Sequence, residues 1–214
     1  MKTSTPNLSL GFEGDDSMST RDRIVRVATL HFAKHGIAGS AMRGIAAEVG
    51  IAAPSIYAHF SSKEELFGEV YSLSVAEQKV YFDELIEESH TLSPTESLQR
   101  LLWGVRAFYR ERPELVDLHL RAVAGSGPLE DPALGGAFRG WDQELLATIR
   151  STYRAGKAKG AFAEVDPDAF GAMFLCLMDG LFLQLRYHEP DVYEIRLNQT
   201  WRCVEVILGI EVGR

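Results

Sequence analysis

The sequence has few cysteines and no long apolar run. Its 214 residues include two cysteines, Cys176 and Cys203, which are too few for a disulfide framework. Residues 1–16 lack the roughly 7–15 consecutive apolar residues of a signal peptide. The most apolar stretch, 170–185, is shorter than the roughly 20 residues of a membrane span and contains Asp179. We therefore expect a reduced, cytoplasmic protein that has no membrane partner.

The sequence also lacks the pattern of β-strands and the short motifs of common enzymes. No stretch alternates apolar and polar residues, so the predicted fold class is all-α. The sequence lacks a Gly-x-Ser-x-Gly elbow, a His-Glu-x-x-His zinc pair, a Gly-x-Gly-x-x-Gly loop and a P-loop. Their absence weakens the hypothesis that the chain is an enzyme such as a helical hydrolase. His119 and His188 have no companion ligands at metal spacing, so we predict neither a metal site nor a cofactor.

The charge is distributed unevenly along the chain. The net charge is −8, yet residues 20–63 contain six basic and two acidic residues and carry +4. The remainder contains 16 basic and 28 acidic residues and carries −12. A basic segment on an acidic body favours an interaction with a polyanion. The six basic residues are Arg21, Arg23, Arg26, Lys34, Arg43 and Lys63.

Order is predicted to begin at Ser19. Residues 1–18 mix small polar residues without a period and are predicted to form a flexible tail. Ser19 and Asp22 have the spacing of a capping box, so a helix should begin here. Apolar positions then recur on one helical face until Gly36, which can end the helix. This face is formed by Ile24, Val27, Ala28, His31 and Phe32.

Two shorter helices are predicted next, over residues 42–49 and 54–60. Ser40 is the expected N-cap of the first helix, and Gly50 is expected to end it. Pro54 lies in the first turn of the second helix, where its missing N–H does no harm. Three short helices with a tight turn between the last two are typical of a helix-turn-helix unit.

Longer helices are predicted in the rest of the chain. Residues 61–64 have the form of a second capping box, which begins a periodic stretch over 64–89. Proline and glycine then punctuate the sequence at intervals. Further helices are predicted near residues 95–112, 114–124, 133–158, 168–188 and 192–209.

The N-terminal residues follow the motif order of a known family. Phe32-Ala-Lys-His-Gly36, Ile56-Tyr57-Ala-His59-Phe60 and Lys63-Glu64-Glu65-Leu66 carry the likeness. In these motifs the segment resembles the DNA-binding domain of the TetR/AcrR family of transcriptional regulators. The resemblance implies a ligand-responsive homodimeric regulator, typically a repressor, that binds palindromic operator DNA. The predicted domains are then a tail (1–18), a helix-turn-helix domain (19–65) and a helical ligand-binding and dimerisation domain (66–214).

The resemblance and the residue types together predict a DNA-contacting surface. In a helix-turn-helix, the second helix enters the major groove, where small side chains allow close approach. Serine can bond a base edge or a phosphate, while tyrosine and histidine suit backbone oxygens. Residues at helix N-termini lie where free amides favour an anionic oxygen, and the resemblance permits Arg43 a base or phosphate contact. The predicted DNA-binding residues are Thr20, Ser40, Arg43, Ala52, Ala53, Pro54, Ser55, Tyr57, His59 and Lys63.

These residues also have structural interpretations. Serines cap helices in any protein, Tyr57 suits a half-buried core position, and Lys63 suits an ordinary solvated one. Ala52 and Ala53 stand where the family often has serine and a polar residue, so direct base readout is expected to be sparse. A helical interaction module without DNA binding therefore stays an alternative. His31, which replaces an apolar residue, is interpreted as a hydrogen-bonded core histidine rather than a sensor.

The apolar C-terminal helices predict a dimer interface. The helix over 168–188 is apolar nearly all round, so we expect it to be buried by its own subunit and by a partner. The last helix has an apolar stripe, and both would join a four-helix bundle across a two-fold axis. A monomeric core is the alternative. Cys176 and Cys203 are expected to be buried, inert thiols. The predicted interface residues are Phe170, Phe174, Leu181, Leu185, Leu197, Trp201, Val204 and Leu208.

Aromatic and methionine residues on the longer helices predict a ligand pocket. Together they would line a cavity for a small apolar or aromatic effector, although residues spaced in this way also form ordinary core. The predicted pocket residues are Phe67, Tyr71, Trp103, Phe108, Phe138, Trp141, Phe174 and Met178.

Overall fold

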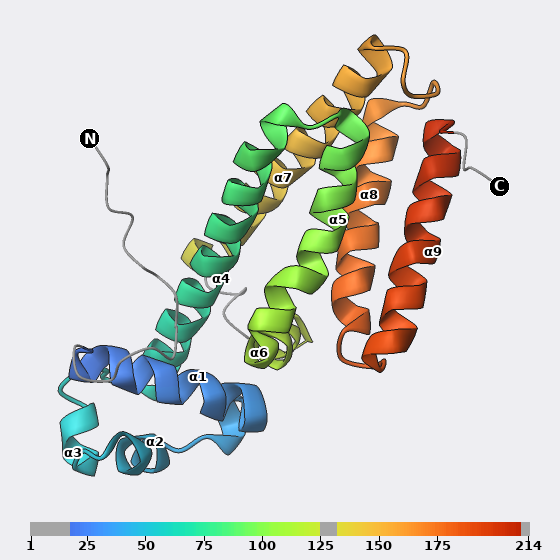
Figure 1. The fold of residues 1–214 in the computed structure, drawn as a ribbon. Coiled ribbons are helices and arrows are strands. Elements are labelled where there is room, and N and C mark those ends of the chain that lie inside the picture. The colour runs from blue at the N-terminus through green and yellow to red at the C-terminus, as the bar shows by residue number, and fades with distance from the viewer. Residues whose placement is uncertain (1–17, 125–131, 211–214) are drawn as a thin grey trace. The chain divides into compact units, whose positions relative to one another are not determined.

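The computed structural model describes residues 18–124 and 132–210. Side chains are described in these ranges except at residues 123–124 and 132–138. In these ranges the chain forms helices and no strand, which confirms the all-α fold class (Figure 1). A short 3-10 turn, η2 (Ser89–Thr91), follows the fourth helix. The helices are α1 (Thr20–Gly39), α2 (Met42–Val49), α3 (Ala53–Ile56), α4 (Lys63–Glu88), α5 (Pro94–Glu111), α6 (Pro113–Ala124), α7 (Pro132–Ala158), α8 (Pro167–Gln184) and α9 (Pro190–Leu208). Most of the predicted tail, residues 1–17, lies outside the described residues.

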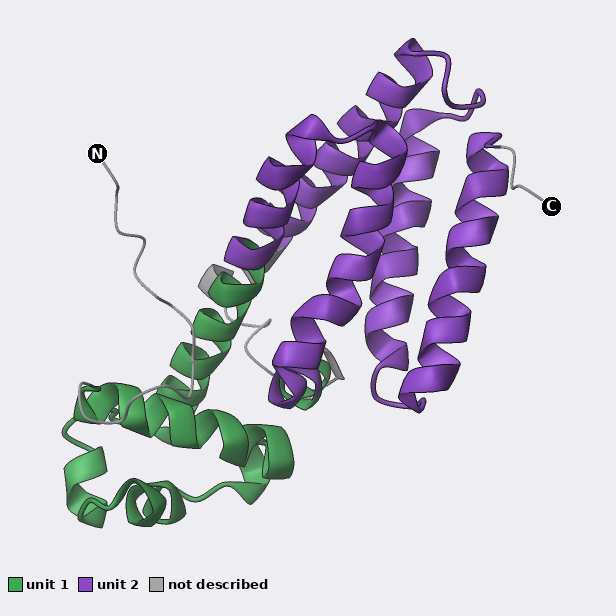
Figure 2. Ribbon diagram, viewed as in Figure 1, with its two compact units in different colours: residues 1–79, 117–135 green, residues 80–116, 136–214 purple. Residues whose placement is uncertain are grey.

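The described residues divide into two compact units (Figure 2). Unit 1 covers residues 1–79 and 117–135, and unit 2 covers residues 80–116 and 136–214, as far as these ranges are described. Helices α4, α6 and α7 each contribute residues to both units. Each unit therefore has its own core and is described by itself.

Local signals explain where most helices begin. Five of them, from α5 to α9, start at a proline, whose fixed φ suits the first helical position and whose missing N–H is not needed there. At α1 the Ser19 hydroxyl oxygen accepts from the Asp22 amide at 3.2 Å, as predicted. At α5 Ser93 and Glu96 form a complete capping box.

Three predicted helix ends are wrong. Ser40 is not the N-cap of α2, because Ala41 takes that position and the Ser40 hydroxyl turns back to the Gly36 carbonyl at 2.7 Å. The second capping box lies one residue later than predicted: the Ser62 hydroxyl accepts from the Glu65 amide at 3.0 Å. Helix α8 ends at Gln184 instead of 188, since the chain turns over the next residues.

Unit 1 is built around the inner faces of α1 and α4. Phe32 of α1 is fully buried and meets Phe67 of α4 edge to face, with 5.1 Å between the ring centroids. Helix α2 packs against α1 and buries its apolar residues there. The fully buried residues of this core include Ile24, Ala28, Phe32, Ile45, Ala46, Ile56, Leu66 and Val70.

Helix α6 adds one buried polar residue to unit 1. His119 is 6% exposed, its Nε2 lies 2.9 Å from the Ser74 hydroxyl oxygen of α4, and its ring meets Tyr71 edge to face. Burial lowers the pKa of His119 to about 4, because charging the imidazole there costs its hydration. The folded protein therefore keeps this histidine neutral.

Unit 2 packs aromatic residues of α7 and α8 around one tyrosine. Tyr153 is fully buried and stacks on Phe170 of α8 and on Phe162 of the α7–α8 connection. Its hydroxyl lies 2.8 Å from the Ala163 carbonyl oxygen, which fixes the same connection. Gly156 leaves room for this arrangement, since a Cβ there would lie 2.1 Å from the Phe162 ring.

We expect Gly156→Ala to lower the free energy of unfolding by about 1–3 kcal/mol, because the new methyl group overlaps a packed ring. Gly140→Ala on the same helix is the matched control. The Cβ added at residue 140 meets no described atom within 4 Å, so this variant should stabilise the helix by up to about 1 kcal/mol. Chemical denaturation of the two variants measures both values, and equal stabilities would contradict the packing argument.

His119 should make stability depend on pH on the acid side. The ordinary histidine pKa is 6.5, so between pH 6.5 and 4 the unfolded chain binds a proton that the folded chain excludes. We expect stability to be complete above pH 6.5 and to fall by up to about 3 kcal/mol as the pH drops to 4. His119→Gln removes this component, so denaturation curves of both proteins over this range should differ in slope. Parallel slopes would contradict the assignment.

Candidate nucleic-acid interface

A glycine turn separates α2 from α3. Gly50 has φ +80° and ψ 28°, a left-handed conformation that favours glycine, and it ends α2 as predicted. The next amide, of Ile51, returns to the Ala46 carbonyl oxygen at 3.0 Å. This closes the last carbonyls of α2 and fixes the direction in which the chain leaves it.

Helix α3 is shorter than predicted. It spans Ala53–Ile56 instead of residues 54–60, and residues 57–59 continue as turns. Ala52 at its N-cap offers no side-chain hydrogen bond, and one turn has no stability of its own. The segment is held by Ile56 and Phe60, which are 0% and 1% exposed. Packing of these two residues therefore holds both the single helical turn and the turns that follow it.

The rest of this segment faces solvent. We define the recognition segment as residues 52–59. Its side chains at Ala52, Pro54, Ser55 and Tyr57 are exposed, and those of Ala53 and His59 are half-buried. Tyr57 is 56% exposed, which rules out the alternative of a core aromatic within unit 1. The six predicted residues of this segment are thus brought together on one short stretch of chain.

The other four predicted residues lie on neighbouring elements of unit 1. Arg43 is exposed in the first turn of α2, and Thr20 and Lys63 are the half-buried first residues of α1 and α4. Ser40 is 4% exposed, and its hydroxyl and amide both donate within the protein. The structure therefore gives Ser40 a role in closing the end of α1.

His31 is hydrogen-bonded, as predicted, but only half-buried. Its Nε2 lies 2.8 Å from an Oε2 of Glu48, which joins α1 to α2. Two cations of the basic segment have partners that the sequence did not predict. Arg21 is exposed and Arg23 is half-buried, and both guanidinium groups bond to protein oxygens.

Comparison with known proteins matches this geometry. The family model described as "Bacterial regulatory proteins, tetR family" matches residues 24–70, which run from α1 into α4. The chain is also 24% identical over 176 residues to the HTH-type transcriptional regulator YhgD of Bacillus subtilis (strain 168), covering 82% of this chain and 89% of YhgD. The helix-turn-helix domain of this chain belongs to the TetR/AcrR family of transcriptional regulators.

Two further relatives are similar to this chain, one in the sequence of a short segment and one in the fold of most of the chain. The HTH-type transcriptional repressor SCO4008 of Streptomyces coelicolor is 44% identical over 55 residues, 26% of this chain and 29% of SCO4008. The structure of AibR in complex with isovaleryl coenzyme A and operator DNA has a TM-score of 0.64 at 17% identity, covering 90% of this chain and all of that one. This TetR-family chain is therefore a transcriptional regulator and not an enzyme.

The predicted pocket residues of this TetR-family regulator are divided between the units. Phe67 and Tyr71 are buried in unit 1, where their rings stack with centroids 6.5 Å apart. In unit 2 Trp103 and Trp141 are half-buried, and Trp103 meets the buried Trp201 edge to face at 5.9 Å. The Phe138 side chain lies outside the described residues. The remaining predicted residues, all buried in unit 2, are Phe108, Phe174 and Met178.

Most of the predicted dimer-interface residues are buried within the single chain. A side chain without exposed surface cannot contact a second subunit, and seven of the eight are at most 5% exposed within one chain. Leu185 alone is half-buried. The seven that form the core of unit 2 are Phe170, Phe174, Leu181, Leu197, Trp201, Val204 and Leu208.

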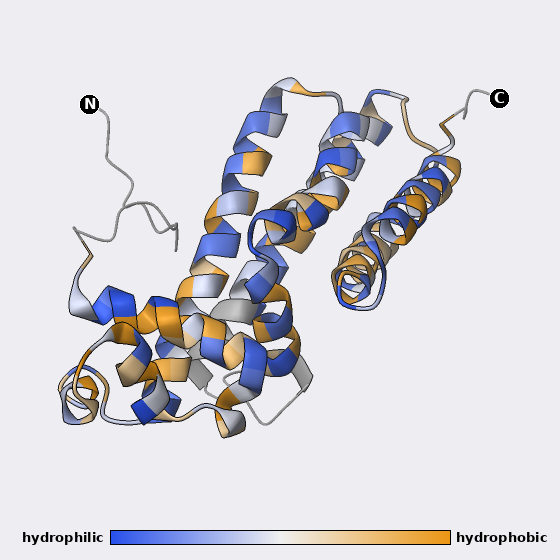
Figure 3. Ribbon diagram, turned by 60° about the horizontal axis from the view of Figure 1, so that its bottom comes forward, coloured by the Kyte–Doolittle hydropathy of each residue, from blue (hydrophilic) through white to orange (hydrophobic). Residues whose placement is uncertain are grey.

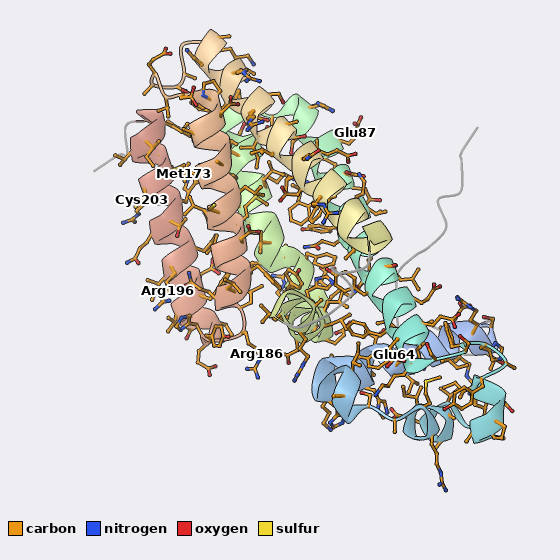
Figure 4. The ribbon with its side chains drawn as sticks, turned by 180° about the vertical axis from the view of Figure 1, so that it is seen from behind. Glu64, Glu87, Met173, Arg186, Arg196 and Cys203 are labelled. Carbon is orange, nitrogen blue, oxygen red and sulfur yellow. The ribbon has the colours of Figure 1, made fainter. Side chains whose placement is uncertain are left out.

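The exposed apolar residues of α8 and α9 are different ones. Hydrophobic and hydrophilic residues alternate along the ribbon of α9 (Figure 3), and its apolar side chains at the surface include Ile195 and Val206, which are 58% and 69% exposed. Cys203 of α9, labelled with Met173 of the adjacent α8 in Figure 4, and Cys176 are exposed, so a single chain does not bury these two thiols. We define the α8–α9 stripe as Cys176, Leu183, Val192, Ile195, Cys203, Val206 and Ile207.

The described residues offer no candidate for two further classes of site. No group of three or more His, Cys, Asp or Glu residues there is arranged to hold a metal ion. In residues 18–124 and 132–210, no helix has the length and apolar character needed to cross a membrane.

Proposed function

We propose that this TetR-family chain is a ligand-responsive, homodimeric repressor that binds a palindromic operator through the recognition segment. The observation that carries the proposal is the exposure of this segment on a helix-turn-helix whose interior is otherwise closed. In such a unit the second helix enters the major groove, and two copies about 34 Å apart reach successive grooves. A regulator that acts on operator DNA works in the cytoplasm.

Residue chemistry divides the proposed contacts. Ala52, Ala53 and Pro54 are small enough for the backbone to approach the groove, and Ser55 is exposed to bond a base edge or a phosphate. We assign Arg43 to a base or phosphate on the same ground, since its guanidinium is the long donor of α2. The contacts to phosphate are assigned to Thr20, Tyr57, His59 and Lys63. We propose no DNA contact for Ser40, because its hydroxyl and its amide already donate within the protein.

The homodimer is proposed through the α8–α9 stripe. Large apolar side chains that share one surface mark an interaction site, and a two-fold dimer needs one self-complementary patch. Leu183, Val192 and Ile195 are 46%, 41% and 58% exposed in the single chain. Pairing of α8 and α9 with the same helices of a second copy would cover them in a four-helix bundle.

The effector is proposed to be a small apolar or aromatic molecule held by the aromatic residues of the helical domain. We place that domain at residues 66–214 and the DNA-binding domain at residues 19–65. The names of relatives agree with these roles: SCO4008 is called a repressor, and AibR was solved with isovaleryl coenzyme A and operator DNA.

A second candidate is an interaction module that has lost DNA binding. Ala52 and Ala53 favour it, because neither side chain can donate to a base or a phosphate. The two candidates differ in one measurable property, binding to duplex DNA at low salt.

Lys63→Ala and Tyr57→Ala should weaken binding on all duplexes alike, because phosphate contacts carry no sequence information. The probe is a duplex selected from a random library by the wild-type protein, compared with a random duplex of equal length. Each phosphate contact adds about 0.9 to the slope of log affinity against log salt, so Lys63→Ala in both subunits should lower it by about 2.

Ser55→Ala is the comparison variant, and it should lower affinity for the selected duplex more than for the random one. Failure of the wild-type protein to bind any duplex at low salt would support the interaction module instead. A salt slope near zero would exclude the phosphate contacts.

Ile195→Glu and Val206→Glu should each dissociate the dimer, because a carboxylate would be buried against apolar side chains of the second copy. We expect the dissociation constant from sedimentation equilibrium to rise at least about 100-fold. Leu30→Glu, at a residue of α1 that is 39% exposed, is the matched control and should leave the dimer intact. A wild-type protein that sediments as a single chain would overturn the dimer.

A further inference from the structure

The recognition segment is attached at both ends to one helix, α1. The segment contains a single helical turn, so its position depends on the residues immediately before and after it. Val49 is the last residue of α2, just before the Gly50 turn, and Phe60 follows the segment directly. Two arginines near the start of α1, Arg21 and Arg23, reach these two residues.

Arg23 holds the end that precedes the segment. Its Nη2 donates to the Val49 carbonyl oxygen at 2.6 Å. The last carbonyls of a helix have no partner within the helix and carry the negative end of its dipole, so a guanidinium is a well-matched cap. The contact crosses 26 residues of sequence and ties the exit of α2 to α1.

Arg21 holds the end that follows the segment. Its guanidinium carbon lies 4.7 Å from the centroid of the Phe60 ring, within cation–π distance. The Nη1 of the same group donates to Glu69 Oε1 of α4 at 2.7 Å, and this hydrogen bond raises the pKa of Arg21. The hydroxyl and the amide of Ser61, the residue after Phe60, both donate to Glu65 Oε2, and these hydrogen bonds lower the pKa of Glu65.

Both cations are therefore committed to protein oxygens. The charge of Arg21 is paired with a carboxylate, and the donor of Arg23 is directed at a helix end inside unit 1. A guanidinium used in this way contributes to DNA binding through the geometry it imposes. We propose that Arg21 and Arg23 are positioning residues that bracket the recognition segment and set its fit to the operator, and that they are not phosphate contacts. This inference rests on the proposed DNA-binding function.

The test compares Arg23→Met and Arg21→Met with Lys34→Met in the full-length protein. Lys34 is an exposed cation of the same helix, and in the described part of the chain its ammonium makes no hydrogen bond or ion pair, so its variant reports the loss of one charge alone. The probes are the selected duplex and the random duplex. We expect each arginine variant to lower the affinity for the selected duplex about tenfold more than Lys34→Met does, with affinity for the random duplex matching the control.

The salt slope separates positioning from phosphate contact. It should stay within about 0.5 of the Lys34→Met slope in both arginine variants, whereas Lys63→Ala lowers it by about 2. A loss of about 2 in an arginine variant would identify that residue as a phosphate contact and overturn the inference. An equal loss of affinity on both duplexes at an unchanged slope would mean only that less protein is folded, which also overturns it.

If the methionine variants do not fold, two lysine variants that keep the positive charge test the same inference. Arg23→Lys retains a donor for the Val49 carbonyl and should keep the ratio of selected to random affinity within about twofold of wild type. Arg21→Lys cannot lie flat over Phe60 while bonding Glu69, so the same ratio should fall about fivefold. An unchanged ratio in Arg21→Lys overturns the role of that residue. A wild-type protein that binds no duplex overturns the proposed function itself, and this inference with it.

Discussion

A single helical turn cannot hold its shape in water, and the recognition segment consists of little more than one. Its free energy of ordering has to come from the two apolar residues that anchor it, Ile56 and Phe60, and from what those anchors touch. Helix α2 packs against α3, and Arg21 of α1 lies over the Phe60 ring, so both helices govern the presentation of Tyr57 and Ser55. The exposed residues can remain small and polar because the buried ones supply the packing.

This constraint changes the meaning of the basic segment. A count of cations treats every arginine as available to a polyanion, yet a guanidinium also satisfies the carbonyls at a helix end and stacks on an aromatic ring. Arg21 and Arg23 are used in this way, which leaves fewer cations for the DNA phosphates than the net charge of +4 suggests. The acidic remainder of the chain adds no attraction, so binding depends on local geometry.

For the C-terminal helices, the sequence does not determine which apolar side chains are buried within one subunit. Helix α8 is apolar nearly all round, and periodicity alone does not say which side packs inside one subunit and which side meets a partner. The structure resolves this: Phe174 and Leu181 fill the core, while Leu183 and Cys176 reach the surface. The pattern therefore predicted the helix, and the structure shows which of its side chains are buried within one subunit.

The sequence by itself determined the helices and most of their starts, because caps and prolines act within a few residues. Examples are Ser93 with Glu96, Asp166, and the proline at the first position of each helix from α5 to α9. It also determined the helix-turn-helix, whose spacing is fixed by Gly50. Only the tertiary structure decided the length of α3, the partners of Arg21, and the neutral state of His119. Those features depend on groups 40 or more residues apart, or on burial, and neither is encoded in the local pattern.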